Sequence, residues 1–188
     1  MEWIIPGTVL PIPQEEIPYI ENKFRSMFMG GGIVLSQVAA ITGLEPYTIQ
    51  NWVKRGFLAS PQQKKYTLRQ LCRILNINML KPALPMEEIC GLLQYVNGHL
   101  DDESDDLIDD TQLYFLFIRI AAQHRQPQDP AGWDACLEQI LAEYDEPVPG
   151  ARERVEKVLR IMLTAWVSAQ LRSYAEAMVE ELKKTEKE

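Results

Sequence analysis

The stretch from Val34 to Leu93 constrains the fold most, because apolar residues recur there at helical spacing and glycine or proline interrupts them at short intervals. A first short helix is expected from a cap at Ser36 through Ile41. Gly43 suits the left-handed position that ends a helix. Pro46 suits the first turn of the helix that follows. Two short helices separated by a tight turn are therefore predicted here.

The second of these helices is expected to run to about Arg55 and to have one apolar face. Ile49, Trp52 and Val53 follow the i, i+3, i+4 spacing of a face that packs inward, and Gly56 ends the helix. The polar residues between them are left facing outward. A short apolar helix, a glycine turn and a second helix with a polar outer face predict a helix-turn-helix motif.

A basic loop follows this motif. Residues 59–66 form a loop that is short for a wing, but Lys64 and Lys65 give it the positive charge of one. Thr67 is a suitable cap for a further amphipathic helix, which Pro82 ends. The sequence therefore predicts a winged helix-turn-helix with a small β-wing.

The other segments are expected to be mostly helical. Residues 1–15 read as a Pro-rich arm that packs on the body, and the acidic run at residues 101–110 reads as a solvated linker whose last aspartates cap a helix. The apolar run at residues 113–122 predicts a buried helix, although a strand remains an alternative for so short a run. The helix at residues 151–184 has a wide apolar stripe, which favours a bundle and a dimer seam.

These elements predict a mainly α fold with four regions. An N-terminal arm and helix occupies residues 1–32, and a winged helix-turn-helix domain occupies residues 33–98. An acidic linker at residues 99–110 leads to a helical C-terminal domain at residues 111–188. We expect this last domain to dimerise, to sense a small-molecule or protein effector, or to do both; its apolar residues alternatively form only a core.

The charge is divided unevenly along the chain. The chain has 188 residues and a formal net charge of −8. The segment from Lys23 to Pro82 holds nine basic residues and one acid, for a charge of +8, and the remainder carries −16. A basic segment joined to an acidic one predicts contact with nucleic acid through one face.

Several other function classes lack support in the sequence. Cys72, Cys90 and Cys136 are not paired at metal-site or disulfide spacing, and His99 and His124 are isolated, so neither a metal nor a cofactor is expected. No paired carboxylates or nucleophile–base patterns indicate an enzyme. The chain has no run of ~20 apolar residues and no basic leader, which favours a cytoplasmic protein without membrane contact.

Parts of the chain resemble known families. The run SQVAAITGLEPYTIQNWVKRGFL resembles the DNA-binding region of MerR regulators, which have a first helix, Thr-Gly, a second helix and Arg-Gly-Leu/Phe-Leu. The run NWVK, followed by Pro61 and Lys64-Lys65-Tyr66, is similar to the bacterial family called domain of unknown function 1836, a MerR-like group. Gln63 departs from the Gly-Tyr-Arg wing typical of MerR proteins, and no cysteine cluster suggests metal sensing.

We therefore expect a transcriptional regulator that binds double-stranded DNA as a homodimer. The amides of Gln50 and Asn51 would read adenine edges in the major groove, and the basic residues would contact phosphates. The alternative is a winged-helix module that binds proteins and not DNA, which suits a net acidic chain. The residues expected to contact DNA are Tyr47, Thr48, Gln50, Asn51, Lys54, Arg55, Lys64, Lys65, Tyr66 and Arg69.

Overall fold

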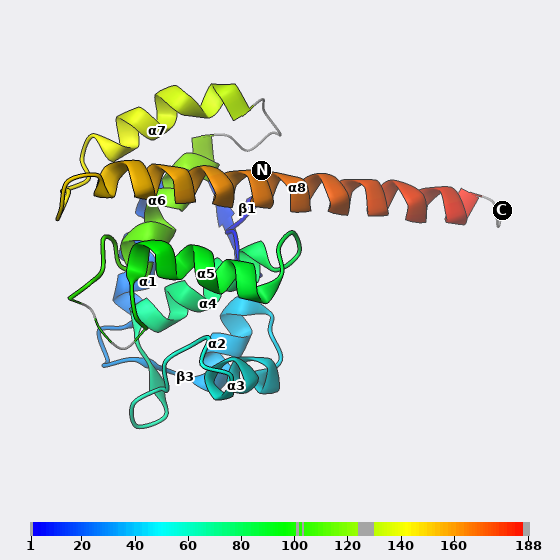
Figure 1. Cartoon of the computed structure of the whole chain (residues 1–188). Helices are drawn as coiled ribbons and strands as arrows, with labels where there is room; N and C mark the ends of the chain where they lie inside the picture. Colours follow the sequence, from blue (N-terminus) through cyan, green and yellow to red (C-terminus); the bar gives the residue numbers. More distant parts are fainter. Residues whose placement is uncertain (1, 101, 103, 124–129, 186–188) are drawn as a thin grey trace.

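The computed structural model describes residues 2–100, 102, 104–123 and 130–185 (Figure 1). Within these ranges the chain is mainly helical, as expected, with eight α-helices and two short antiparallel sheets of two strands each. None of the helices in the described ranges combines the length and the apolar composition that a membrane span requires.

The N-terminal arm is a small hairpin that lies against the body. Strands β1 (Glu2–Ile4) and β2 (Pro11–Pro13) pair with each other. The hydroxyl of Tyr114 donates to the carbonyl of Pro6 at 2.9 Å, and the side-chain amide of Asn78 donates to the carbonyl of Gly7 at 2.8 Å. These bonds to main-chain oxygens hold the arm on the helices beneath it.

A short 3-10 helix, η1 (Gln14–Tyr19), continues from the arm into α1 (Ile20–Met27). The chain then reverses at residues 28–32 and forms strand β3 (Ile33–Val34). Ile20 and Phe24 are buried, so α1 contributes one face to the core.

The two helices predicted from the glycine and proline spacing are α2 (Leu35–Thr42) and α3 (Pro46–Lys54). Gly43 has a φ of 69° and closes α2 in the left-handed conformation, and Pro46 occupies the first turn of α3. Three residues therefore connect the two helices, which confirms the predicted tight turn.

The predicted cap at Ser36 is wrong, because α2 begins earlier. Val34 is the capping residue, and its N–H donates to the side chain of Gln37 at 3.0 Å. Val34 also belongs to a strand, so its extended backbone (φ −86°, ψ 162°) leads directly into the helix. Strand pairing therefore decides where α2 starts.

The loop after α3 turns back as a narrow hairpin. Strand β4 (Lys65–Tyr66) pairs with β3, and Gln62 forms a bridge with Lys65. Gln63 and Lys64 lie between them with φ of 49° and 62°. Positive φ at both central residues is the requirement of the tight turn that suits twisted hairpins. We call residues 61–66 the β-hairpin loop; it lies beside α3 (Figure 1).

The remaining helices build most of the core. They are α4 (Leu68–Leu80), α5 (Met86–Asn97), α6 (Asp110–Gln123), α7 (Asp134–Leu141, after the 3-10 turn η2 at Pro130–Trp133) and α8 (Ala151–Thr185). Helix α6 is largely buried, as predicted, and packs along α4, α7 and α8. One hydrophobic cluster is continuous across residues 98–111, where the sequence suggested a linker between two domains.

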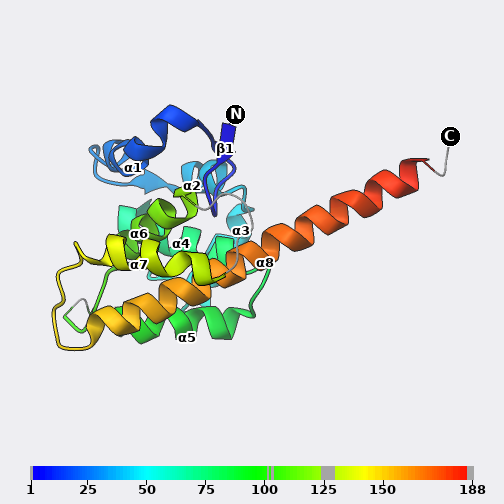
Figure 2. The same cartoon turned by 90° about the horizontal axis from the view of Figure 1, so that it is seen from above.

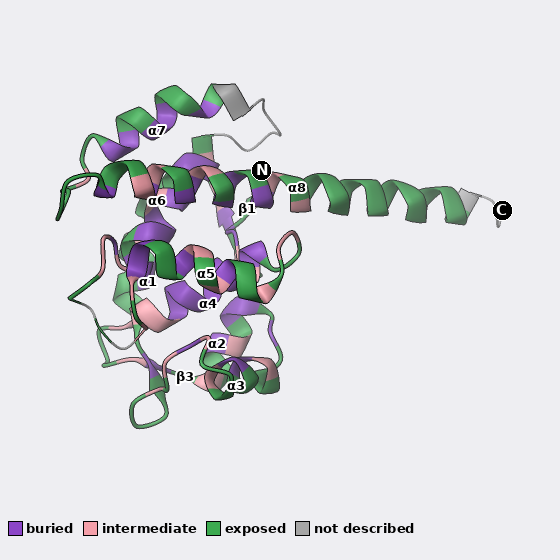
Figure 3. Cartoon of the chain, viewed as in Figure 1, coloured by how far each residue is buried: buried purple, intermediate pink, exposed green. Residues whose placement is uncertain are grey.

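Helix α8 extends beyond the body (Figures 1 and 2). Its apolar residues from Val155 to Trp166 are mostly buried, and the ring of Phe117 meets Trp166 edge-on at 5.8 Å. Beyond Leu171 the described side chains are exposed (Figure 3). The predicted apolar stripe is therefore covered only along its first half.

Replacing Gly7 by alanine should destabilise the fold. Gly7 has a φ of 77°, and an added Cβ would lie 2.5 Å from the carbonyl oxygen of Leu75. The backbone strain alone is worth about 1–3 kcal/mol. Gly91 is the control: it is helical and exposed, and an added Cβ there meets no atom within 4 Å. Urea unfolding should show Gly91→Ala stabilised by about 1 kcal/mol. Equal effects at the two positions would contradict the close contact at Gly7.

Candidate nucleic-acid interface

The outer face of α3 is polar and accessible. Ile49 and Trp52 are buried against the body. On the opposite side, residues 47, 50, 51 and 54 are spaced three and four apart and therefore share one face of the helix. Their side chains are exposed, and Thr48 beside them is half-buried. The exposed residues of this face are Tyr47, Gln50, Asn51 and Lys54.

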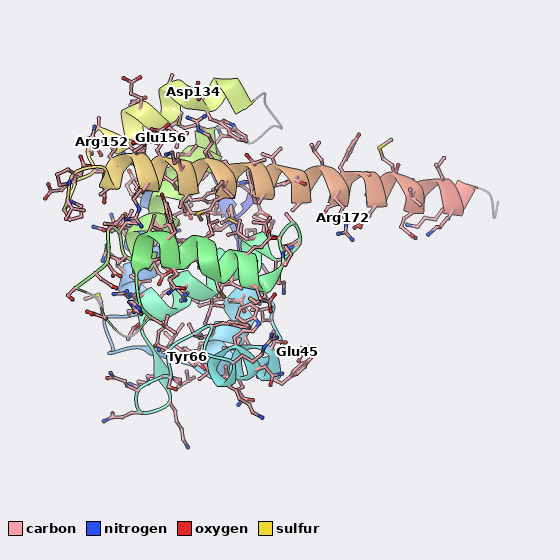
Figure 4. The ribbon with its side chains drawn as sticks, in the orientation of Figure 1. Glu45, Tyr66, Asp134, Arg152, Glu156 and Arg172 are labelled. Atoms are coloured by element: carbon pink, nitrogen blue, oxygen red, sulfur yellow. The ribbon has the colours of Figure 1, made fainter. Side chains whose placement is uncertain are left out.

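The β-hairpin loop borders the same face. Gln50 and Val53 of α3 line a groove of about 520 Å³ together with Pro61, Lys64 and Tyr66 of the β-hairpin loop. The groove therefore brings an amide of α3 and a lysine of the β-hairpin loop to one surface. Figure 4 shows Tyr66 and Glu45 together at the end of the molecule away from α8.

Three lysines at this surface have no acidic partner. Lys54, Lys64 and Lys65 are exposed and form no salt bridge with any residue that the structure describes. Lys65 makes a long hydrogen bond of 3.5 Å to the carbonyl of Gly30. Unpaired ammonium groups of this kind are available to an anionic partner.

Most other basic residues of the positive segment are neutralised by acids. The pairs are Lys23 with Glu16, Arg25 with Glu21 at 2.7 Å, Arg55 with Glu87 at 3.4 Å, Arg69 with Asp106 at 2.7 Å and Arg73 with Asp110 at 3.4 Å. All five of these acids are more than ten residues away in the sequence from α2, α3 and the β-hairpin loop. Among the described residues, the unpaired positive charge of the segment at residues 23–82 therefore lies mainly on the three lysines beside α3.

Arg55 lies at the edge of this surface. Its guanidinium stacks over the ring of Phe57 at 4.6 Å and pairs loosely with Glu87. Both partners of that pair are well exposed, so the pair contributes little stability and gives way easily to a stronger anion.

Two of the ten residues expected to contact DNA do not present their side chains on this exposed surface. Tyr66 is buried, with 3% of its surface exposed, because it pairs with Ile33 in the small sheet and its ring joins the core. Burial also raises the pKa of its phenol. Arg69 turns away from α3 and pairs with Asp106. Tyr66 and Arg69 therefore lie on the inner side of the proposed interface and help to hold it in place.

The acidic segment is not solvated throughout, contrary to the sequence-based interpretation. Asp110 is buried against Arg73 and lies 4.0 Å from Arg69, which also holds Asp106. Asp109 is the capping residue expected for α6, since its Oδ1 accepts the N–H of Thr111 at 2.6 Å. Arginines four apart on α4 face aspartates four apart at 106 and 110. The equal four-residue spacing of the two arginines and the two aspartates is the sequence pattern that could have predicted this network.

The network also holds the chain that leads into the β-hairpin loop. The Nε of Arg73 donates to the carbonyl of Phe57 at 2.9 Å. The side-chain amide of Gln70 donates to the carbonyls of Ala59 at 3.0 Å and Ser60 at 3.1 Å. Helix α4 is thus bonded to the acidic segment on one side and to the loop on the other.

No metal-binding geometry was found in the described part of the chain, where no three His, Cys, Asp or Glu side chains cluster suitably. Cys72 and Cys136 are buried and Cys90 is half-buried. His99 bonds Asp105 at 2.8 Å on the surface. His124, the other isolated histidine of the sequence, lies outside the described residues.

The stability of the fold should depend on the ionisation of Asp106. Burial raises the pKa of this carboxyl from 3.8 to about 6, against the attraction of Arg69. The folded chain holds the proton more tightly, so the stability from Asp106 is greatest below pH 4 and is lost as the pH rises through 6. Asp106→Asn cannot ionise. The free energy of unfolding of Asp106→Asn minus that of wild type should therefore increase from pH 4 to pH 7, by on the order of 1–2 kcal/mol.

Urea unfolding at several pH values measures this difference. Asp145→Asn, at an exposed position nearby, is the control and should not follow the same pH window. A constant difference between Asp106→Asn and wild type across the range would contradict the buried environment of Asp106.

Comparison with known proteins places the chain in a family. The chain is 26% identical over 130 residues to an uncharacterized protein, YkrK, of Bacillus subtilis (strain 168). The aligned region covers 67% of this chain and 54% of YkrK, so the chain spans about half the length of that relative. No solved structure matches the chain.

A family model gives the wider assignment. The model of the family Domain of unknown function (DUF1836) matches residues 15–117, which is more than half of the chain. The match includes α1, α2, α3, the β-hairpin loop, α4, α5 and the first part of α6. The chain therefore belongs to the DUF1836 family.

Proposed function

We propose that this chain is a sequence-specific, DNA-binding transcriptional regulator. Helices α2 and α3 act as a helix-turn-helix, and the β-hairpin loop acts as the wing, in the manner of MerR-like regulators. One observation carries the proposal: α3 and the β-hairpin loop share an exposed surface with two amides and three lysines that have no acidic partner among the described residues. These residues are Gln50, Asn51, Lys54, Lys64 and Lys65.

Helix α3 is the element that would enter the major groove. Its exposed face is clear of other elements, and its inner face is fixed by Ile49 and Trp52. The amides of Gln50 and Asn51 can each pair with the two hydrogen-bonding atoms of an adenine edge, worth about 1–3 kcal/mol of discrimination. Tyr47 and Thr48 in the first turn are placed to donate to a phosphate.

The lysines would supply affinity without sequence preference. Lys54 extends from the last turn of α3, and Lys64 and Lys65 extend from the β-hairpin loop, so together they flank the amides. Each phosphate that they neutralise releases counterions, which makes binding depend on salt. The net charge of −8 over the whole chain repels DNA elsewhere and confines contact to this face.

We propose further that the regulator is a homodimer joined through α8. One helix-turn-helix makes few base contacts, and a dimer reads two half-sites about 34–36 Å apart. The protruding half of α8 carries exposed apolar side chains three and four residues apart, which form one stripe. They are Leu171, Tyr174, Met178 and Leu182. The same stripe on a second copy is its natural partner, since a two-fold interface joins identical patches.

A second candidate is a module that binds a protein segment. The groove between α3 and the β-hairpin loop is lined by Val34, Leu35, Val53 and Pro61 besides its polar residues. A groove of this character accepts an apolar peptide, and winged-helix folds serve such contacts as well as DNA. DNA binding is favoured because the rim of the groove is basic in an otherwise acidic chain.

Removing the wing lysines should weaken binding to all DNA sequences alike. Lys64→Ala with Lys65→Ala should flatten the slope of log affinity against log salt by about one unit for each lost phosphate contact. Asn51→Ala should instead relax the base preference and keep the slope. Lys157→Ala, on α8 and away from α3, is the control. Fluorescence anisotropy at several salt concentrations distinguishes the two effects. A changed preference with an unchanged slope in the lysine variant would contradict the assigned roles.

Charge on the α8 stripe should separate the dimer. Met178→Glu places a carboxylate in the proposed seam and should give a monomer by analytical ultracentrifugation, because burying an unpaired charge is costly. Ser173→Glu, on the opposite side of α8, should leave a dimer. A wild-type chain that is monomeric at the same concentration would contradict the seam.

A further inference from the structure

A second cavity lies behind the proposed DNA-binding surface. It has a volume of about 830 Å³ and opens between the start of α4, the segment at residues 106–109, α6 and α7. Pockets of 300–1,000 Å³ commonly hold small molecules. The proposed contact with DNA makes no use of this space.

The lining combines an apolar floor with an acidic rim. Apolar side chains come from Leu107, Phe115, Leu116, Ile140 and Tyr144. The other lining residues include five carboxylates and two guanidinium groups, and the guanidinium groups of Arg69 and Arg119 pair with Asp106 and Glu143. The carboxylates are Glu21, Asp106, Asp109, Glu143 and Asp145. An occupant with an apolar body and a positive charge matches this lining better than a neutral or anionic one does.

Asp106 gives the cavity a specific polar anchor. Its side chain is nine-tenths buried, with 9% exposed, and its Oδ2 contacts Arg69 at 2.7 Å. Its Oδ1 is buried and has no hydrogen-bond partner among the residues that the structure describes. A buried acceptor without a donor costs free energy, and because this oxygen has almost no accessible surface, a ligand N–H recovers that cost only when Arg69 or the carboxylate shifts. The single pair with Arg69 leaves this carboxylate incompletely compensated.

We infer that this cavity binds a small organic amine, with its protonated nitrogen at Asp106 and its apolar body against Phe115, Leu116 and Tyr144. The aromatic rings of Phe115 and Tyr144 favour a cation beside them as well as apolar contact. The amine competes with Arg69 for the carboxylate of Asp106.

This competition gives the site a route to the β-hairpin loop, a consequence that rests on the proposed DNA-binding function. Arg69 lines both the amine cavity and a smaller one of about 370 Å³, which also includes Ser60 and Gln62 at the base of the β-hairpin loop. Gln70, the next residue, bonds the carbonyl of Ser60. Movement of Arg69 would therefore shift the start of α4 and the loop bonded to it, and with them the affinity for DNA.

Direct binding tests the site without DNA. Tryptamine is the probe, and tryptophol, in which a hydroxyl replaces the ammonium, is the neutral match. Calorimetry on the full chain at pH 7.5 should show tryptamine binding at least about tenfold more tightly than tryptophol. Equal affinities would mean a non-specific apolar cavity and would overturn the proposal, as would no binding of tryptamine at millimolar concentration.

Variants assign the binding to this cavity. Asp106→Asn should weaken tryptamine binding by about tenfold or more, and Glu138→Gln, exposed on α7 outside the cavity, should not. Leu116→Trp keeps every charge and fills the space, so it should also block binding; thermal melts confirm that each variant folds. Binding that survives both cavity variants would overturn the assignment.

The two proposals fail separately. Tryptamine binding that depends on Asp106, in a chain that never binds DNA, supports the amine site and contradicts the regulator. Sequence-specific DNA binding without tryptamine binding leaves the regulator and removes the amine site. If both hold, tryptamine should change the affinity of wild type for DNA and leave that of Asp106→Asn unchanged.

Discussion

The buried pair of Arg73 with Asp110 is the interaction on which the position of α4 against α6 depends. Arg73 and Asp110 are both almost fully buried, so losing either partner would strand a charge in the core, at a cost of about 3–5 kcal/mol. The pairing fixes α4 against α6, and α4 in turn bonds the loop on the way to β4. The position of the β-hairpin loop beside α3 therefore depends on charges at the other side of α4.

The same pairing decides which charges reach the surface. Acids from outside the basic segment neutralise its arginines, and in the part of the chain that the structure describes the lysines of α3 and the β-hairpin loop have no acidic partner. A chain with a net charge of −8 can thus present a confined positive face. The proposed regulator and the inferred amine site lie on the two sides of this network, and Arg69 is the residue that they share.

Local rules predicted much of the fold from the sequence. Gly43 and Pro46 ended and began their helices as expected, and the apolar run at residues 113–122 gave a buried helix. Tertiary contacts decided the rest. Strand pairing moved the cap of α2 from Ser36 to Val34 and buried Tyr66, while ion pairs drew Arg69 away from α3. Such outcomes depend on partners distant in sequence, which a periodic pattern does not identify.

The proposed function depends on α3 and the β-hairpin loop reading DNA. Selection from a random duplex library, with the retained DNA sequenced and its affinity measured at low and moderate salt, tests it most directly. We expect an enriched, nearly palindromic site whose binding weakens steeply with salt. No enrichment, together with no salt-sensitive binding, would contradict it and favour a protein-binding module.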